Sequence, residues 1–261
     1  MPSKENPPRV RLALRVGVTG KRELPHSPST RALLEEHVSE VLDLVKLAAG
    51  KTPPRERQYL DAEPDLRFVS PLAWGADQLC ANVARKAGFR LECPLPFPRA
   101  EYEKDFEDAD DDGEWLRDFH RLLAEATNVL ELDGTREVDG TGETAYLAVG
   151  RTVLAHVDVL ISIWDGEDEV KIGGTSHITK EALAAGIPVV WIHATHPKEH
   201  RPTLLIGRDH LANDEAVLSS CSCSSITSWP LQSPSTQSCP TSSPSGVLVG
   251  KGGSPTTCSN R

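Results

Sequence analysis

Four small residues in a row, Gly173-Gly174-Thr175-Ser176, are the part of this sequence best suited to holding a phosphate group. They follow an apolar run, Asp158 to Trp164, that breaks at Asp165-Gly166, and they precede a helical pattern from Ile178 to Ala185. A second apolar run, Ile187 to Ile192, comes next. Backbone N–H groups at the start of a helix bind phosphate, and glycine lets a ligand approach the chain closely. The order strand, glycine-rich loop, helix, strand therefore predicts an anion site, with a plain helix N-cap as the alternative.

A second glycine turn, Thr19-Gly20-Lys21-Arg22, follows an apolar run from Val10 to Val18. It differs from a Walker A loop, because only two residues separate Gly17 from Gly20 and an Arg follows the Lys. The dinucleotide fingerprint G-x-G-x-x-G is also missing, so neither an NTPase nor an ordinary NAD enzyme is indicated, and we expect no cofactor. The turn is explained either by ligand contact or by a tight strand-to-helix connection that needs glycine.

Three acidic residues, Asp77, Glu143 and Asp165, follow predicted strands at positions where carboxylates hold ribose hydroxyls in nucleotide-binding folds. Glu143 and Asp165 are the candidate catalytic residues, since either could polarise a sugar or activate water. Each is equally suited to being a solvated loop acid. The predicted ligand-binding set is completed by small residues of the same turns, namely Gly75, Ala76 and Gly166.

Two patterns resemble metal sites without completing one. The run Asp108-x-Asp110-x-Asp112-Gly113 opens like a calcium loop, but Phe119 stands where the bidentate Glu belongs. The spacing of His193, His196 and His200 would suit zinc, yet these residues follow a strand in a loop that contains a proline. We therefore expect a solvated acidic turn and no bound metal.

Apolar runs alternate with helical patterns along the first 215 residues. Strands are predicted at Val10–Val18, Leu66–Ser70, Leu91–Phe97, Asn128–Leu132, Asp158–Trp164 and Ile187–Ile192. Helices are predicted between them at Ser29–Ala49, Ala76–Ala87, Glu114–Ala126, Glu143–His156 and Ile178–Ala185. This alternation predicts an α/β fold, a Rossmann-like doubly wound, mostly parallel sheet with helices on both faces. Such folds bind ligands outside the carboxyl ends of their strands, where the polar and glycine-rich turns fall.

Charge is distributed unevenly along the chain. From Ala216 to Arg261 there is no Asp or Glu and only two of the 28 basic residues, so the first 215 residues hold 26 basic against 38 acidic residues, a net charge near −12. Such a charge repels duplex nucleic acid, and no cluster of Lys and Arg with interleaved aromatics offsets it. We therefore expect no nucleic-acid partner.

The composition also divides the chain into segments. Residues 1–9 are predicted to be a disordered N-terminus, 10–215 a single nucleotide-binding domain, and 216–261 a Ser/Pro/Cys-rich segment that is either a disordered tail or a frame-shifted translation. No apolar stretch approaches the roughly 20 residues of a membrane span, and residues 1–8 lack the apolar core of a secretory signal. We expect a cytoplasmic protein with no membrane partner.

Taken in order, three motifs resemble the SLOG superfamily, named for the Smf/DprA and Lonely Guy proteins, and especially its bacterial nucleotide-sensor branch. They are Val16 to Arg22, Ser70 to Asp77, and Ile163 to Thr175, and the resemblance extends over about Val10 to Ala194. It implies a Rossmann-like fold, a nucleotide or nucleotide-derived ligand, and a pocket lined by Gly20, Lys21, Arg22, Gly75, Ala76, Asp77 and the stretch from Gly173 to Ser176.

The sequence departs from the phosphoribohydrolase branch of that superfamily, which carries Gly-Gly-x-Gly-Thr-x-x-Glu. Here Gly173-Gly174-Thr175 lacks the extra glycine, and Glu181 lies too far along to match. We therefore expect binding or sensing of a nucleotide-like small molecule, in a stress or anti-phage signalling system as the resemblance implies. A nucleoside monophosphate N-glycosidase is the alternative, so the sequence leaves open whether the chain is an enzyme. A separate effector protein and a homo-oligomer also remain open as partners.

Overall fold

A computed structural model describes residues 9–51, 59–60, 62–107, 109, 112–136, 142–168 and 171–207. The chain divides into two units, Met1–Thr227 and Ser228–Arg261, and every described residue belongs to the first. The predicted disordered N-terminus, apart from Arg9, lies outside the described residues, as does the segment 216–261. The expected domain limit at residue 215 lies there too and stays a prediction.

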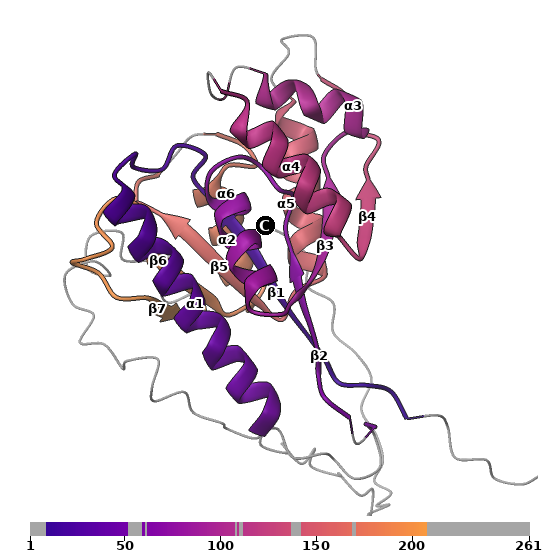
Figure 1. Cartoon of the computed structure of the whole chain (residues 1–261), viewed down its shortest axis with the longest axis vertical. Helices are drawn as coiled ribbons and strands as arrows, with labels where there is room; N and C mark the ends of the chain where they lie inside the picture. Colours follow the sequence, from indigo (N-terminus) through magenta and orange to yellow (C-terminus); the bar gives the residue numbers. More distant parts are fainter. Residues whose placement is uncertain are drawn as a thin grey trace, which may run out of the picture. The chain divides into compact units, whose positions relative to one another are not determined.

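The described residues form one seven-stranded sheet with the order β4-β3-β2-β1-β5-β6-β7 (Figure 1). All neighbouring strands are parallel except β6 and β7, which are antiparallel. The strands are β1 (Ala13–Gly20), β2 (Asp65–Val69), β3 (Arg90–Leu95), β4 (Asn128–Glu131), β5 (Val159–Trp164), β6 (Val189–His193) and β7 (Thr203–Leu205).

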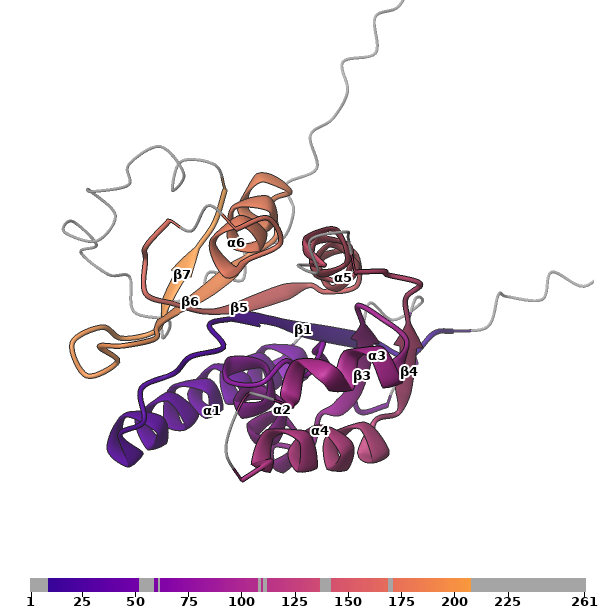
Figure 2. The ribbon, with the colours of Figure 1, turned by 90° about the horizontal axis from the view of Figure 1, so that it is seen from above.

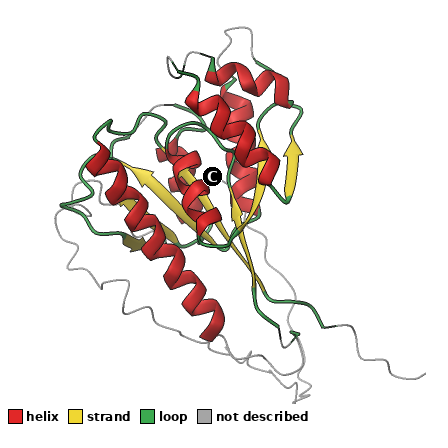
Figure 3. Ribbon diagram, viewed as in Figure 1, coloured by secondary structure: helices red, strands yellow, loops and turns green. Residues whose placement is uncertain are grey.

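Helices cover both faces of this sheet (Figures 2 and 3). One face carries α1 (Pro28–Lys51), α2 (Ala76–Lys86) and α4 (Glu114–Glu125), and the opposite face carries α5 (Glu143–Ala155) and α6 (Thr175–Ala184). A short α3 (Arg99–Tyr102) and a 3₁₀ turn η1 (Glu103–Phe106) join β3 to α4. The predicted Rossmann-like, doubly wound α/β fold is confirmed. Among the described helices, none has the length and apolar character that crossing a bilayer requires.

The strand order reverses beside β1. From β1 the chain proceeds outwards through β2 and β3 to the edge strand β4, and α5 then returns it so that β5 pairs with the other side of β1. The helices change face at the same step (Figure 2). At the carboxyl ends of β1 and β5, Gly20 lies opposite Ile163. In open α/β sheets a crevice forms at this kind of reversal, because the connections on its two sides leave in opposite directions.

The interior strands supply the core. Val159, Leu160, Ile161 and Ile163 of β5 are all buried, as a strand covered on both faces requires. Helix α1 buries residues at helical spacing, Leu34, Val38, Val41, Leu42 and Val45, which is the periodicity that predicted it. The edge strand β4 is exposed along its length. The core thus holds the reversal between β1 and β5 firmly in place.

Some element boundaries differ from those predicted. Strand β1 begins at Ala13, because Val10 makes only an isolated bridge to Tyr59, and it continues through Thr19 and Gly20. Helix α6 begins at Thr175, three residues before the first apolar position of its periodic pattern. The three short elements α3, η1 and β7 were not predicted, since runs of three or four residues carry too little periodicity.

Candidate functional site

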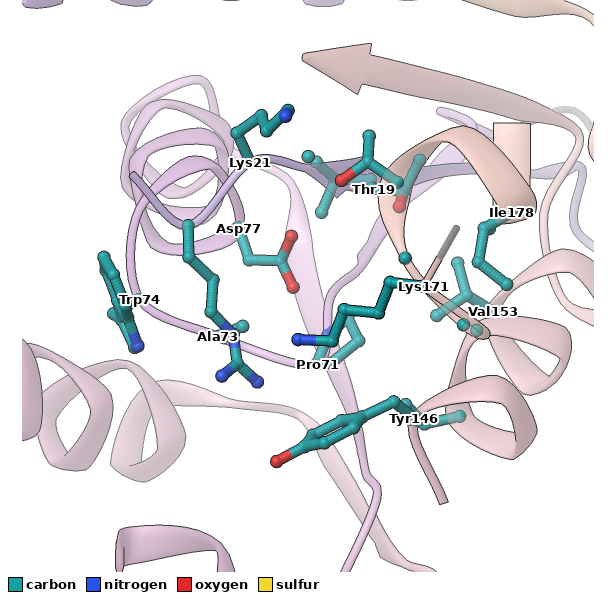
Figure 4. A pocket seen from close by; sticks show the side chains of 18 of the residues that line it. Thr19, Lys21, Pro71, Ala73, Trp74, Asp77, Tyr146, Val153, Lys171 and Ile178 are labelled. Atoms are coloured by element: carbon teal, nitrogen blue, oxygen red, sulfur yellow. The ribbon is translucent and has the colours of Figure 1, made fainter. Parts of the chain in front are cut away.

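A pocket of about 760 Å³ lies at the reversal of the sheet, beyond the carboxyl ends of β1 and β5. Its walls come from the turn after β1, the turn before α2, the inner side of α5 and the start of α6. Figure 4 shows Trp74 and Tyr146 at two sides of the space into which Asp77 and Lys171 point. The pocket contains nine of the predicted ligand-binding residues: Thr19, Gly20, Lys21, Arg22, Asp77, Asp165, Gly173, Gly174 and Thr175.

Two glycines let the turn after β1 pack closely against the start of α2. A Cβ on Gly20 would lie 2.4 Å from the Cβ of Ala76. Gly75 has a φ of +87°, and a Cβ there would lie 2.0 Å from the carbonyl oxygen of Arg22. The Ala76 N–H donates to the carbonyl oxygen of Lys21 over 3.0 Å. Gly75 and Ala76 thus support the turn from behind and do not line the pocket.

The glycine pair before α6 brings the first turn of that helix to the pocket wall. Gly173 has a φ of +76°, and a Cβ there would lie 2.6 Å from the backbone nitrogen of Leu147 in α5. Gly174 is the N-cap residue, and no described side chain caps the helix there. Thr175 lines the pocket, whereas Ser176 is buried outside its lining. The N-terminal N–H groups and the helix dipole favour an anion at such a place.

Buried hydroxyl groups fix α6 to the sheet. Thr179 donates from its Oγ1 to the carbonyl oxygen of Thr175 over 2.7 Å, and the same Oγ1 lies 2.8 Å from the Oγ of Ser162 in β5. These hydrogen bonds are buried, so losing one would leave a polar group without a partner in a region of low dielectric. The start of α6 is therefore held rigidly relative to β5.

Three cationic side chains line the pocket. The Lys21 ammonium lies 3.0 Å from Oδ2 of Asp165, which follows the neighbouring strand β5. The Arg22 guanidinium lies 3.2 Å from Oδ2 of Asp105, in η1. Lys171 comes from the loop before α6, and Figure 4 shows its ammonium group pointing into the pocket above Tyr146. An anionic ligand would therefore meet positive charge from two separate loops.

Asp105 organises one wall of the pocket, although its own carboxylate is only 6% exposed. It accepts hydrogen bonds from Arg22, from the Tyr146 hydroxyl and, over 2.6 Å, from Arg136. The Arg22 guanidinium also lies over the Tyr146 ring, 5.0 Å from its centroid. Burial and the Asp105 carboxylate raise the pKa of Tyr146, so its phenol stays neutral and acts as a donor. Arg22 is thereby held in one position.

The sequence did not single out the residues that complete this wall. Asp105 and Tyr146 lie in segments that become neighbours only through folding, so spacing along the chain does not reveal them. Trp74 lies within the motif Ser70 to Asp77 and Lys171 in the loop before the glycine pair, but the sequence assigned neither of them a role. A basic or aromatic residue beside a predicted anion loop was the available indication for these two.

Asp77 is the buried acid of the pocket, with only 6% of its surface exposed. Burial raises the pKa of this carboxyl group to about 7, against the opposing effects of a hydrogen bond to the Ala73 backbone and of the Arg22 charge. The other predicted acid, Glu143, is half-buried at the start of α5 and does not line the pocket. Gly166 also lies outside the lining.

The three histidines of the suggested zinc spacing form a ring cluster at the end of β6. His193 stacks on His200 with 4.6 Å between ring centroids, and His196 meets His193 edge-on at 5.2 Å. Burial and the two neighbouring histidines lower the pKa of His193. Within the described residues no group of three or more His, Cys, Asp or Glu side chains could hold a metal ion. Asp108 and Asp110, of the calcium-like run, lie outside those residues.

Comparisons with known proteins find solved structures with distant similarity to this chain. No protein-family model and no curated protein matches the chain. Solved structures with a similar fold include DNA processing protein A from Helicobacter pylori, at 16% identity and a TM-score of 0.42, over 71% of this chain and 70% of that one. The corresponding Streptococcus pneumoniae protein matches at 17% and 0.41, over 69% of this chain but only 50% of that one.

A third similar structure is the Moco carrier protein of Chlamydomonas rheinhardtii, at 13% identity and a TM-score of 0.34, over 72% of this chain and 80% of that one. Matches of such low sequence identity say nothing about function and concern the fold alone. The resemblance to the SLOG superfamily rests on the three sequence motifs.

The exclusion of nucleic acid as a partner needs correction. The Helicobacter pylori protein, whose fold is similar, is described as binding single-stranded DNA. The physical error lies in arguing from net charge, because the local potential and not the total charge governs binding of a phosphate chain. In this chain of net charge −10, Lys21, Arg22 and Lys171 still gather at one pocket. The acidic composition therefore does not exclude nucleic acid.

Proposed function

We propose that the SLOG-like chain binds a nucleotide or nucleotide-derived small molecule in the pocket at the reversal of its sheet. The observation that carries the proposal is the convergence of Lys21, Arg22 and Lys171 with the first turn of α6 on one cavity. A phosphate group satisfies both features at once, because it accepts backbone N–H donors and pairs with cations. A volume of about 760 Å³ lies within the usual range for small-molecule sites.

The rest of the lining suits the other parts of a nucleotide. Trp74 is half-buried at the pocket and offers an aromatic surface on which a base can stack. Asp165, although paired with Lys21, retains lone pairs that accept ribose hydroxyls. Both features distinguish the proposed ligand from inorganic phosphate, since neither would contribute to holding a bare anion.

The proposal includes a sensing role, in which occupancy of the pocket by the nucleotide is the signal. Hydrolysis of an N-glycosidic bond is the less supported alternative. Of the two candidate catalytic acids, Glu143 lies outside the lining and Asp165 is already ion-paired with Lys21. A general base works best when it is free to accept a proton near the operating pH.

The test is to incubate the protein with AMP, NAD and cyclic nucleotides, and to follow thermal stability and release of free base together. Stabilisation without base release supports binding, and base release that Glu143→Gln abolishes would replace it with the enzymatic alternative. Lys21→Gln should remove most of the stabilisation. Lys46→Gln is the matched control, because Lys46 pairs with Asp43 on the exposed side of α1. Failure of all these nucleotides to stabilise the wild-type protein would refute the proposal.

A further inference from the structure

Asp77 differs from every other acid at the pocket. Its side chain comes from the first turn of α2 and is buried, yet it lines the cavity. Figure 4 shows its carboxylate pointing into the space opposite Tyr146. By comparison, Glu23 is exposed, Asp165 is 19% exposed and ion-paired, and Asp105 is held by two arginines. Asp77 forms no ion pair with any residue that the structure describes.

Two of the charged groups around Asp77 are paired with other acids. Arg22 contributes a favourable charge but turns its guanidinium towards Asp105, and Lys21 pairs with Asp165. Lys171 faces the same space from the loop before α6. On the protein side, Asp77 interacts with Cys80 of its own helix and with Tyr102 of α3.

Those last two neighbours provide no positive charge. Burial raises the pKa of Cys80 and of Tyr102 well above their usual values, so both groups are neutral at physiological pH. An ionised Asp77 would therefore sit in a poorly solvated place with only partial compensation, and burial accordingly raises its pKa to about 7. A phosphate brought into the same cavity adds a second negative charge, which disfavours ionisation further.

We propose that Asp77 binds the ligand as a neutral carboxylic acid, donating a hydrogen bond to an anionic oxygen of the nucleotide, so that binding retains or takes up one proton. This inference rests on the proposed function and goes further, because it assigns a donor role to a residue whose sequence context suggested an acceptor for ribose. The proton stays on the carboxyl oxygen and is shared with the ligand oxygen. No bond is broken in the step.

The consequence is a binding affinity that falls with pH. Once Asp77 loses its proton, the donor disappears and two negative charges face each other. Above pH 7 the protonated fraction falls about tenfold for each pH unit, and the affinity for an anionic nucleotide should fall with it. The second ionisation of a phosphate monoester is near pH 6, so between pH 7 and 9 it contributes little to the slope.

The test measures the dissociation constant of AMP between pH 7 and 9 for wild type, Asp77→Asn and Asp43→Asn. Asparagine keeps an N–H donor where the acid has its O–H, so Asp77→Asn should bind within a few-fold of wild type at pH 7 and lose most of the pH dependence. Asp43→Asn is the matched control, because it makes the same chemical change at an exposed residue of α1 outside the pocket, keeps Asp77 and should keep the slope. If either variant fails to fold, the pH dependence of the wild-type dissociation constant still tests the inference by itself.

The outcomes separate the inference from the proposed function. A flat wild-type profile, or a large loss of affinity in Asp77→Asn at every pH, would mean that the ionised carboxylate binds the ligand, and would overturn the inference alone. If wild type binds neither AMP, NAD nor cyclic nucleotides at pH 7, the proposed function fails and the inference fails with it. A falling wild-type profile that Asp77→Asn flattens establishes both.

Discussion

Replacing Asp77 by Asn should change how the stability of the ligand-free protein depends on pH. The pKa of Asp77 is raised by burial from 3.8 to about 7 in the folded state. Between these values the unfolded chain releases this proton while the folded protein keeps it, so the free energy of unfolding falls as the pH rises. A difference of about three pKa units corresponds to about 4 kcal/mol lost between pH 4 and 7. Above pH 7 this contribution levels off.

Urea denaturation of wild type and Asp77→Asn, at half-unit steps from pH 4 to 8, measures this contribution directly. The variant should become more stable relative to wild type as the pH rises, because its amide never ionises. Taking the difference between the two proteins cancels the titration of the other acids. Asp43→Asn makes the same change at an exposed residue of α1, keeps Asp77 and should therefore keep the wild-type slope. A difference between wild type and Asp77→Asn that is constant across this range would refute the reasoning about burial.

Three further outcomes follow from the geometry. Gly75→Ala should lower the free energy of unfolding by about 3 kcal/mol, because the new methyl group would clash with the Arg22 backbone and the positive φ would be strained. Gly88→Ala is the control: Gly88 has a φ of +86° but nothing within 4 Å, so this change should cost only about 1 kcal/mol. Equal losses of stability in urea denaturation would contradict the close approach of Gly75 to Arg22. Asp105→Asn should weaken AMP binding roughly tenfold in calorimetry, because the Arg22 guanidinium and the Tyr146 phenol that Asp105 holds become free to move. An unchanged affinity would show that the positions of Arg22 and Tyr146 do not contribute to AMP binding. Ser162→Ala and Thr179→Val should each destabilise by about 1–2 kcal/mol, and the double variant by clearly less than their sum, since Thr179→Val alone leaves the buried Ser162 hydroxyl without its acceptor; strict additivity in thermal unfolding would argue against the buried pair.

The sequence predicted the fold because its determinants are local. The apolar run of β5 and the helical spacing of α1 each report burial directly, and their alternation limits the sheet to a few topologies. For the same reason the sequence placed Gly20 at the end of β1 and Gly173 just before α6. The structure also shows why glycine is needed at both positions: a Cβ on Gly20 would clash with Ala76, and a Cβ on Gly173 would clash with the backbone of Leu147 in α5.

The parts of the pocket that could not be predicted depend on tertiary packing. Asp105 and Tyr146 are 41 residues apart, yet their hydrogen bond fixes the position of Arg22. Glu143 was chosen because it follows a strand, but position at a strand end does not determine which way a helix turns its first side chain. The protonation of Asp77 depends on burial by residues from several elements, which no local pattern encodes.

The central claim is that the pocket between β1 and β5 holds the phosphate of a nucleotide against the start of α6. A crystal structure of the protein with bound AMP tests it most directly. The phosphate should lie within about 3 Å of backbone N–H groups in the first turn of α6, with Lys21 or Lys171 beside it. AMP bound elsewhere on the protein, or in this pocket with its phosphate directed away from α6, would contradict it.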